Sequence, residues 1–313
     1  MLKSKTQTHK YLVTGCAGFI ASRVAFLLLE SGHEVIGVDN LNDYYDVSLK
    51  QHRLDVLTQF DRFEFCHLDI EDRSAVDNLF DLHQFDAVLN LAARAGVRYS
   101  MENPHVYMTT NAMGSLNLLE AMRAKEVTKY VLASTSSLYA GQPMPFDESL
   151  PVNTPISPYA ASKKSAEAMS YAYHYLYGID VSICRYFTVY GPAGRPDMCI
   201  FRFIKWIDEG TPIELFGDGE QSRDFTYVDD IALGTIAALS PVQFEVFNLG
   251  GGGEPVSLNT VIGKLETLLG KKAIISRLPT FKADLLTTQA NITKANRMLG
   301  WQPKTMLDDG LRE

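Results

Sequence analysis

The first half of the chain alternates short apolar runs with longer segments of helical periodicity. The apolar runs are Tyr11–Thr14, Glu34–Asp39, Phe63–His67, Ala87–Leu91, Tyr130–Ser134 and Val181–Cys184. The helical patterns are Ser22–Glu30, Ser74–Leu82, Asn111–Ala124 and Tyr159–Tyr177. Such an alternation is typical of right-handed βαβ units, so it predicts an α/β fold with a doubly wound parallel sheet.

The pattern changes after Arg185, where loops rich in Gly and Pro separate shorter elements. We therefore expect two domains in a chain of 313 residues. Residues 10–187 are predicted to form the sheet domain, to which 226–250 are expected to return. Residues 188–313 are predicted to form a smaller lobe that covers the carboxyl edge of the sheet.

Composition excludes several classes of function. The net charge is −8 and no basic stripe is present, which argues against a nucleic-acid partner. No two of the four cysteines have C-x-x-C spacing, so neither a metal site nor a redox pair is expected. Met1–Lys10 is not followed by the apolar stretch of a signal peptide, and Val24–Leu29 is too short to cross a bilayer. These features predict a cytoplasmic protein without a membrane partner.

A glycine turn follows the first predicted strand and opens the first helix. The segment Gly15–Ala21 has the spacing G-x-x-G-x-x-A, in which Gly15 and Gly18 let phosphates approach the backbone at a helix N-terminus. Taken alone, the turn is equally compatible with an ordinary strand–helix connection. Asp39 adds support, because a carboxylate at the end of the second strand binds the ribose hydroxyls of NAD and repels the phosphate of NADP. The two signals together predict a Rossmann-type fold that binds NAD.

Further cofactor contacts are expected at the ends of the neighbouring strands. Asp69 and Ile70 follow the third predicted strand, where they either face the adenine or cap a helix. The remaining predicted contacts are Phe19, Ile20, Asn40, Asn42, Leu91, Ala92 and Ala93.

Tyr159 and Lys163 lie four residues apart on a predicted helix, so their side chains share one face. A free phenol has a pKa of about 10 and is a poor base at neutral pH, whereas a nearby ammonium lowers that pKa. The pair can then take a proton from a hydroxyl while hydride leaves for NAD. With 15 tyrosines in the chain, this spacing also arises by accident on a solvated helix face.

A run of hydroxyl side chains, Ser134-Thr135-Ser136-Ser137, stands at the end of a predicted strand. Ligands bind at the carboxyl ends of strands in open parallel sheets, although such runs also occur in ordinary loops. Hydroxyl groups at this position can hydrogen-bond a reacting oxygen. Thr135, Tyr159 and Lys163 are therefore the predicted catalytic set.

Longer segments resemble one enzyme family. They are Asp39–Asp46, Ala95–Arg98, Arg185–Pro192, Gly194–Met198 and Arg223–Asp230. Together with the glycine turn and the catalytic set, they make nearly the whole chain similar to the extended short-chain dehydrogenase/reductases. Within that family the chain most resembles the UDP-glucuronate 4-epimerases, relatives of the UDP-glucose 4-epimerases. The resemblance implies bound NAD and a UDP-sugar substrate.

The resemblance also implies roles for the catalytic set. Thr135 and Tyr159 would contact the 4-hydroxyl of the sugar, with Tyr159 acting as base and then as acid. Lys163 would tune Tyr159 and bind the nicotinamide ribose. Ser136 and Ser137 would lie next to the sugar.

Three further residues gain roles from the resemblance. Thr188 stands where galactose epimerases carry asparagine, and the shorter side chain leaves room for a carboxylate on carbon 6. Arg195 would bind that carboxylate. Arg223 would bind the UDP phosphates. Either arginine could instead form a surface ion pair.

The implied reaction is the conversion of UDP-glucuronate to UDP-galacturonate through a transient 4-keto sugar. Related decarboxylases and dehydratases carry a glutamate in the hydroxyl cluster, whereas this chain reads Thr135-Ser136-Ser137. Epimerisation is therefore preferred over a lyase reaction. The alternatives are a UDP-glucose 4-epimerase, a UDP-glucuronate decarboxylase and a non-catalytic NAD-binding regulator.

Two further implications concern assembly and the nucleotide. The family usually pairs through two helices per subunit, so Asn111–Ala124 and Tyr159–Tyr177 would form the contact of a homodimer or else belong to the ordinary core. Residues 281–284 depart from the Pro-Gly-Asp that is common near the uridine in the family. The uridine contacts are therefore not assigned.

Overall fold

A computed structural model describes residues 7–280 and 285–313, so the departure at 281–284 lies outside the described residues. Its main feature is a seven-stranded parallel sheet with the order β11-β6-β5-β4-β1-β2-β3. The strands are β1 (Lys10–Thr14), β2 (Glu34–Asp39), β3 (Phe63–His67), β4 (Ala87–Asn90), β5 (Lys129–Thr135), β6 (Asp180–Tyr186) and β11 (Phe244–Leu249). The order reverses between β1 and β4, which is the switch point of a doubly wound sheet. The predicted Rossmann-type α/β fold is confirmed.

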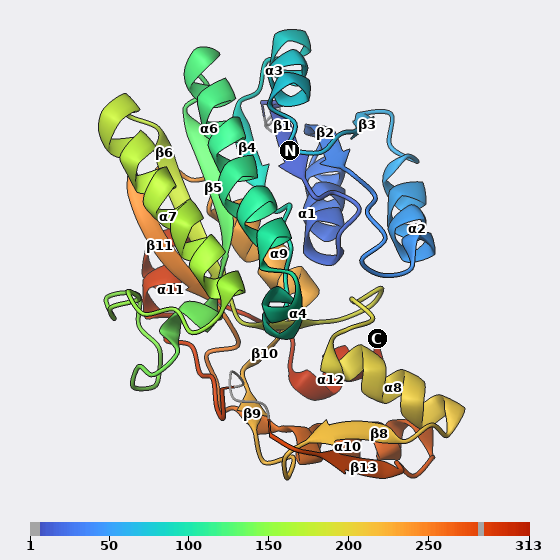
Figure 1. Cartoon of the computed structure of the whole chain (residues 1–313). Helices are drawn as coiled ribbons and strands as arrows, with labels where there is room; N and C mark the ends of the chain where they lie inside the picture. Colours follow the sequence, from blue (N-terminus) through green and yellow to red (C-terminus); the bar gives the residue numbers. More distant parts are fainter. Residues whose placement is uncertain (1–6, 281–284) are drawn as a thin grey trace, which may run out of the picture.

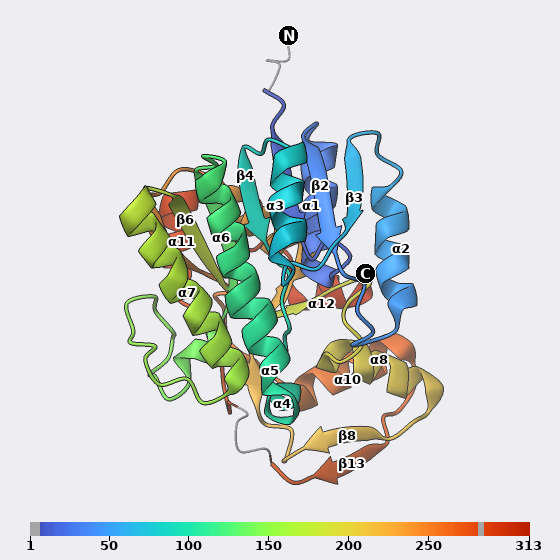
Figure 2. The ribbon, with the colours of Figure 1, turned by 45° about the horizontal axis from the view of Figure 1, so that its top comes forward.

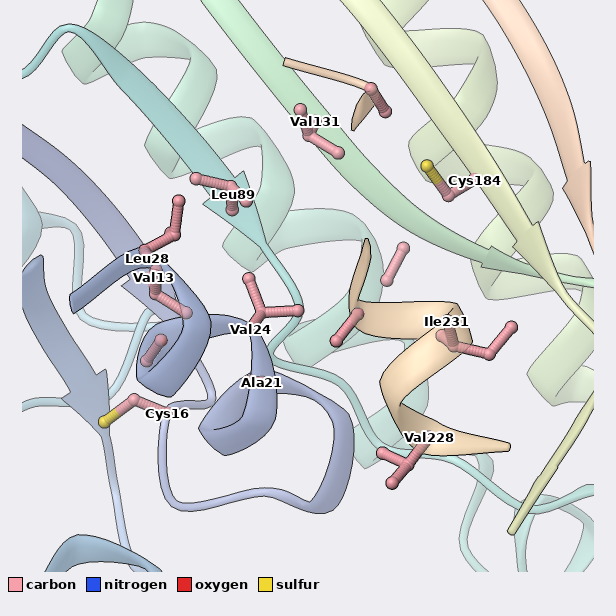
Figure 3. Close-up of a cluster of buried hydrophobic side chains, with 14 of the residues drawn as sticks. Val13, Cys16, Ala21, Val24, Leu28, Leu89, Val131, Cys184, Val228 and Ile231 are labelled. Atoms are coloured by element: carbon pink, nitrogen blue, oxygen red, sulfur yellow. The ribbon is translucent and has the colours of Figure 1, made fainter. Parts of the chain in front are cut away.

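Helices cover both faces of this sheet (Figures 1 and 2). On one face lie α1 (Phe19–Glu30), α9 (Val228–Ala237) and α11 (Thr293–Leu299), with α2 (Val47–Leu57) beside α1. On the other face lie α3 (Arg73–Leu82), α6 (Gly114–Ala124) and α7 (Pro158–Tyr177). The side chains of α1 and α9 pack against those of the strands and form an apolar core on the first of these faces, which Figure 3 shows in part. Because both faces are covered, the central strands are rich in apolar residues, and every residue of β5 is buried, including the polar Lys129, Ser134 and Thr135.

The helix predicted from Asn111 begins differently in the structure. Residues Met108–Met113 form a π-helical segment, and the α-helix starts only at Gly114. The Asn111 side chain accepts from the Arg94 amide and donates to the Arg94 carbonyl, both at 2.9 Å. Such wide turns are frequent at functional sites, and here the turn aims Asn111 at the loop that follows β4.

The remaining elements gather below the carboxyl edge of the sheet. They are α4 (Val97–Glu102), α5 (Pro104–Tyr107), β7 (Thr188–Tyr190), α8 (Cys199–Glu209), β8 (Ile213–Phe216), β9 (Ser222–Arg223), β10 (Phe225–Tyr227), β12 (Val256–Ser257), α10 (Leu258–Leu269), β13 (Ile275–Leu278) and α12 (Leu307–Arg312). Residues of α8, β8, α10 and α12 enclose a separate apolar core. The division of the chain at residues 187 and 188 stays a prediction. None of the described helices has the length and apolar composition needed to cross a membrane.

Candidate active site

A cavity of about 710 Å³ lies at the carboxyl edge of the sheet. Residues of α4, α8, β8 and β9, which gather below this edge, also line it. This volume is within the range of pockets that hold small ligands. The cavity brings together every residue that the sequence predicted for the site: Gly15, Gly18, Phe19, Ile20, Asp39, Asn40, Asn42, Asp69, Ile70, Leu91, Ala92, Ala93, Thr135, Ser136, Ser137, Tyr159, Lys163, Thr188, Arg195 and Arg223.

The glycine turn leaves no room for side chains. Gly15 has φ +69°, and a Cβ on it would lie 2.8 Å from the Cα of Ala92. A Cβ on Gly18 would lie 2.9 Å from the Gly15 carbonyl oxygen. Gly18 is also the N-cap of α1, whose first-turn amides favour an anion. The turn therefore fits the pyrophosphate of a dinucleotide.

Asp39 ends β2 as a buried carboxylate. Its Oδ2 accepts from the amide of Ala17 at 3.2 Å, and its Oδ1 accepts from the amide of Leu41 at 2.8 Å. The ammonium of Lys50 lies 3.5 Å from Oδ1, and only 5% of the Lys50 side chain is exposed. Burial lowers the pKa of Lys50, and the charge of Asp39 partly offsets this effect. Sequence reasoning missed Lys50 because its helix, α2, has no apolar periodicity.

A second polar network continues from β2 toward β3. Asn40 donates to Asp69 at 2.7 Å, and Asn42 donates to the Asn40 side-chain oxygen at 2.7 Å. Of the two alternatives given for Asp69, the helix cap does not hold, because the N-cap of α3 is Asp72, whose carboxylate accepts from the Ala75 amide. Asp69 thus lines the cavity with its carboxylate held by Asn40.

Tyr159 lies in the first turn of α7, beside the hydroxyls that follow β5. Thr135 Oγ1 accepts from the Ser137 amide and contacts the Ser137 hydroxyl, both at 3.1 Å. Burial raises the pKa of Tyr159, whereas a hydrogen bond with Thr135 and the positive charge of Arg195 lower it. The phenol is therefore partly buried at the cavity wall, and two of its neighbours favour the phenolate.

Lys163 is buried one turn further along α7. Its ammonium donates to the carbonyl of Ala133 at 2.8 Å. Burial lowers the pKa of Lys163 to about 8, against the charge of Glu167. The expectation that Lys163 lowers the pKa of Tyr159 stays a prediction; in the structure the charge of Arg195 also lowers it. Sequence spacing could not reveal this interaction, since Arg195 comes from the loop after β7.

The guanidinium of Arg195 has a partner of its own. Its Nε and Nη2 donate to the two carboxylate oxygens of Asp197 at 3.0 and 2.5 Å, and Nη2 also donates to the Ala95 carbonyl at 3.3 Å. Arg223, in β9, donates to the Ser222 carbonyl at 2.8 Å. Both arginines are thus held at the cavity wall by neighbouring groups.

Comparisons with known proteins agree with this geometry. The model of the NAD dependent epimerase/dehydratase family matches residues 11–250. A UDP-glucuronate 4-epimerase of Thermodesulfobacterium geofontis is 58% identical, over 96% of this chain and 94% of that protein. The structure of UDP-glucuronic acid 4-epimerase from Bacillus cereus, in complex with UDP-glucuronic acid and NAD, matches with a TM-score of 0.91 at 39% identity and covers 96% of both chains.

A UDP-glucose 4-epimerase from Thermotoga maritima, solved with UDP-glucose, is also similar. It matches with a TM-score of 0.88 at 34% identity, over 97% of this chain and 96% of that chain. On the strength of the matched family model and of relatives that cover nearly its whole length, this chain belongs to the NAD dependent epimerase/dehydratase family.

Proposed function

We propose that the chain is an NAD-dependent isomerase that inverts carbon 4 of a UDP-sugar and converts UDP-glucuronate to UDP-galacturonate. The observation that carries the proposal is the meeting of Asp39, Thr135, Tyr159, Lys163 and Arg195 at one cavity. The 58% identical relative, a UDP-glucuronate 4-epimerase, supports the same reaction.

Residues 10–187 and 226–250 hold the cofactor in this proposal, and 188–313 hold the UDP-sugar. The glycine turn binds the pyrophosphate, and the carboxylate of Asp39 accepts hydrogen bonds from the ribose hydroxyls. Lys163 binds the nicotinamide ribose. Bound NAD supplies the acceptor and donor of hydride for carbon 4 of the sugar.

Tyr159 moves the proton of the 4-hydroxyl. Its phenolate accepts that proton, and the phenol returns it after the sugar has turned over, so one group serves as base and acid. Thr135 hydrogen-bonds the same oxygen and holds it beside the phenol. The charge of Arg195 favours the phenolate, which is the form needed to start the reaction.

Arg195 and Thr188 select a sugar with a carboxylate on carbon 6. Both line the cavity near Tyr159, and a guanidinium is suited to a carboxylate. A 4-keto sugar with this carboxylate readily loses carbon dioxide, so the enzyme has to hold the group firmly. Thr135, Ser136 and Ser137 include no acid that would promote elimination.

The direct test is incubation of the purified protein with UDP-glucuronate, without added reductant, followed by analysis of the sugar. The proposal expects UDP-galacturonate of unchanged mass. A product that has lost carbon dioxide would identify a decarboxylase, and conversion of UDP-glucose alone would identify the second candidate, which the Thermotoga maritima relative favours.

The Arg195→Ala variant is expected to lose the preference for the acid sugar. Loss of a charge-assisted hydrogen bond to the carboxylate corresponds to about 1.5–3 kcal/mol, or roughly 10- to 150-fold in kcat/KM. The ratio of kcat/KM for UDP-glucuronate to that for UDP-glucose measures this effect. An equal loss of kcat/KM for both sugars would show that Arg195 does not bind the carboxylate of the substrate.

Asp39→Asn is expected to weaken discrimination between NAD and NADP by about tenfold or more. The change removes the carboxylate that repels the extra phosphate and leaves the ammonium of Lys50 close to its place. Binding of both nucleotides, measured by calorimetry on the variant and on Lys50→Met/Asp39→Asn, tests the contribution of each charge. Unchanged discrimination in Asp39→Asn would remove Asp39 from the cofactor site.

We further propose a homodimer that pairs through α6 and α7. Ala168, Ala172 and Tyr175 share one face of α7, where Ala168 and Tyr175 are exposed and the two alanines let a partner helix approach. Ala168→Glu is expected to yield a monomer in light scattering after size exclusion. A monomeric parent protein would contradict the proposal.

A cytoplasmic location is also part of the proposal. All four cysteines of the chain are free thiols, which agrees with a reducing compartment.

A further inference from the structure

We propose that Glu64, Cys66 and His83 bind a zinc ion at the edge of the sheet, away from the cavity described above. None of the three residues lines that cavity. Cysteine spacing predicted no metal site, because Glu64 and Cys66 belong to β3 whereas His83 follows α3. The fold is what brings them together.

The local geometry follows from the strand and the helix. Glu64 and Cys66 are two residues apart in β3, so their side chains point to the same face of this edge strand. His83 is the C-cap of α3, which packs on that face. The three potential ligand atoms all lie within 4.8 Å of one another, and Nε2 of His83 is 3.7 Å from a carboxylate oxygen of Glu64.

These separations suit a tetrahedral ion. Zinc binds sulfur at about 2.3 Å and nitrogen or oxygen at about 2.0–2.2 Å, which puts tetrahedral ligands roughly 3.5 Å apart. The His83–Glu64 distance already approaches this value. The other distances between ligand atoms are within 4.8 Å, and rotation of the side chains would shorten them to the tetrahedral separation. A thiolate, an imidazole and a carboxylate form a zinc donor set, whereas magnesium and calcium take oxygen ligands. Water would complete the fourth position.

The charge and packing around the three residues suit a cation. The carboxylate of Glu64 places a negative charge 3.7 Å from Nε2 of His83, and a bound metal would replace the thiol proton of Cys66. The imidazole of His83 stacks on Phe85 with ring centroids 5.9 Å apart, and 14% of its side chain is exposed. An ion here would tie the end of α3 to the edge strand.

The experiment titrates zinc into the NAD-loaded protein after chelator treatment and follows binding by calorimetry. Wild type is expected to bind one ion per chain. Cys66→Ser and His83→Gln are each expected to weaken binding by about 100-fold or more, since even residues that merely support a metal ligand contribute 10- to 100-fold. Cobalt, bound in place of zinc, should show a thiolate charge-transfer band that is lost in Cys66→Ser.

His67→Gln is the matched control. His67 is the next residue of β3 after Cys66, so its side chain lies on the opposite face, and it is exposed. The His67→Gln variant should bind zinc with the affinity of the wild type. If Cys66→Ser also bound zinc with the wild-type affinity, or if the cobalt-loaded wild type showed no thiolate band, the proposal would be overturned. Neither readout involves turnover, so the outcome is independent of the sugar chemistry.

Discussion

Tyr159→Phe is expected to lower kcat for UDP-sugar epimerisation by about 10²- to 10⁴-fold, the usual contribution of a general acid–base group. The variant loses one hydroxyl and keeps the ring, so the first turn of α7 and the nearby Thr135 stay in place. The proton of the 4-hydroxyl then has no acceptor at this position. Initial rates on UDP-glucuronate, with NAD affinity measured in parallel, separate lost chemistry from lost binding.

Tyr107→Phe is the matched control for this prediction. The ring of Tyr107 lies 6.0 Å from that of Tyr159, and its hydroxyl donates to the Gly96 carbonyl at 2.9 Å. Removing that hydroxyl breaks one hydrogen bond, which contributes about 1 kcal/mol, but it leaves the proposed proton acceptor, Tyr159, intact. A similar loss of kcat in both variants, or no loss in Tyr159→Phe, would show that Tyr159 is not the base.

The second large effect is expected on stability. Arg185→Met should lower the free energy of unfolding by about 3–5 kcal/mol, because it leaves the buried carboxylate of Glu167 without its hydrogen-bonded cation and with only the Lys164 ammonium at 3.9 Å. Both side chains are 4% exposed, and two hydrogen bonds of 2.9 and 2.7 Å join them. Chemical denaturation followed by circular dichroism measures the change.

Two comparisons sharpen the stability test. The double variant Arg185→Met/Glu167→Leu removes both charges and is expected to recover most of the loss. Arg202→Met breaks the half-exposed pair with Glu214 and should change stability by no more than about 1 kcal/mol. If the double variant were as unstable as Arg185→Met, the buried charge would not be the cause.

The pair of Arg185 and Glu167 also connects the core to the site. Glu167 accepts from the Ser134 hydroxyl at 2.6 Å, and its charge raises the pKa of Lys163 against burial. Ser134 therefore differs from the other hydroxyls of the run after β5, because it is committed to the carboxylate. Thr135, Ser136 and Ser137 remain as the proposed sugar contacts.

Local sequence patterns predicted the sheet because its strands are buried on both faces. β2 and β3 have the predicted bounds, and α3 and α7 begin one residue before theirs. α1 begins at Phe19, three residues earlier than predicted, because the preceding glycine turn carries no helical periodicity. Propensity and burial act over a few residues at a time, so they are visible in the chain itself.

What the sequence could not predict depends on contacts between distant segments. The helix α2 is polar along most of its length, so the buried Lys50 beside Asp39 went unseen. The charge of Arg195 acts on Tyr159 from a loop 36 residues further along the chain, and no spacing rule anticipates such an interaction. The π-helical turn at Asn111 likewise depends on its hydrogen bonds with Arg94.

The most direct test of the proposed chemistry is epimerisation of UDP-glucuronate in deuterium oxide, with the product examined by proton NMR. If the hydrogen of carbon 4 leaves and returns as hydride while Tyr159 handles only the hydroxyl proton, UDP-galacturonate will carry protium at carbon 4. Deuterium at carbon 4 of the product would contradict this account, because it would mean that the hydrogen left as a proton and exchanged with solvent.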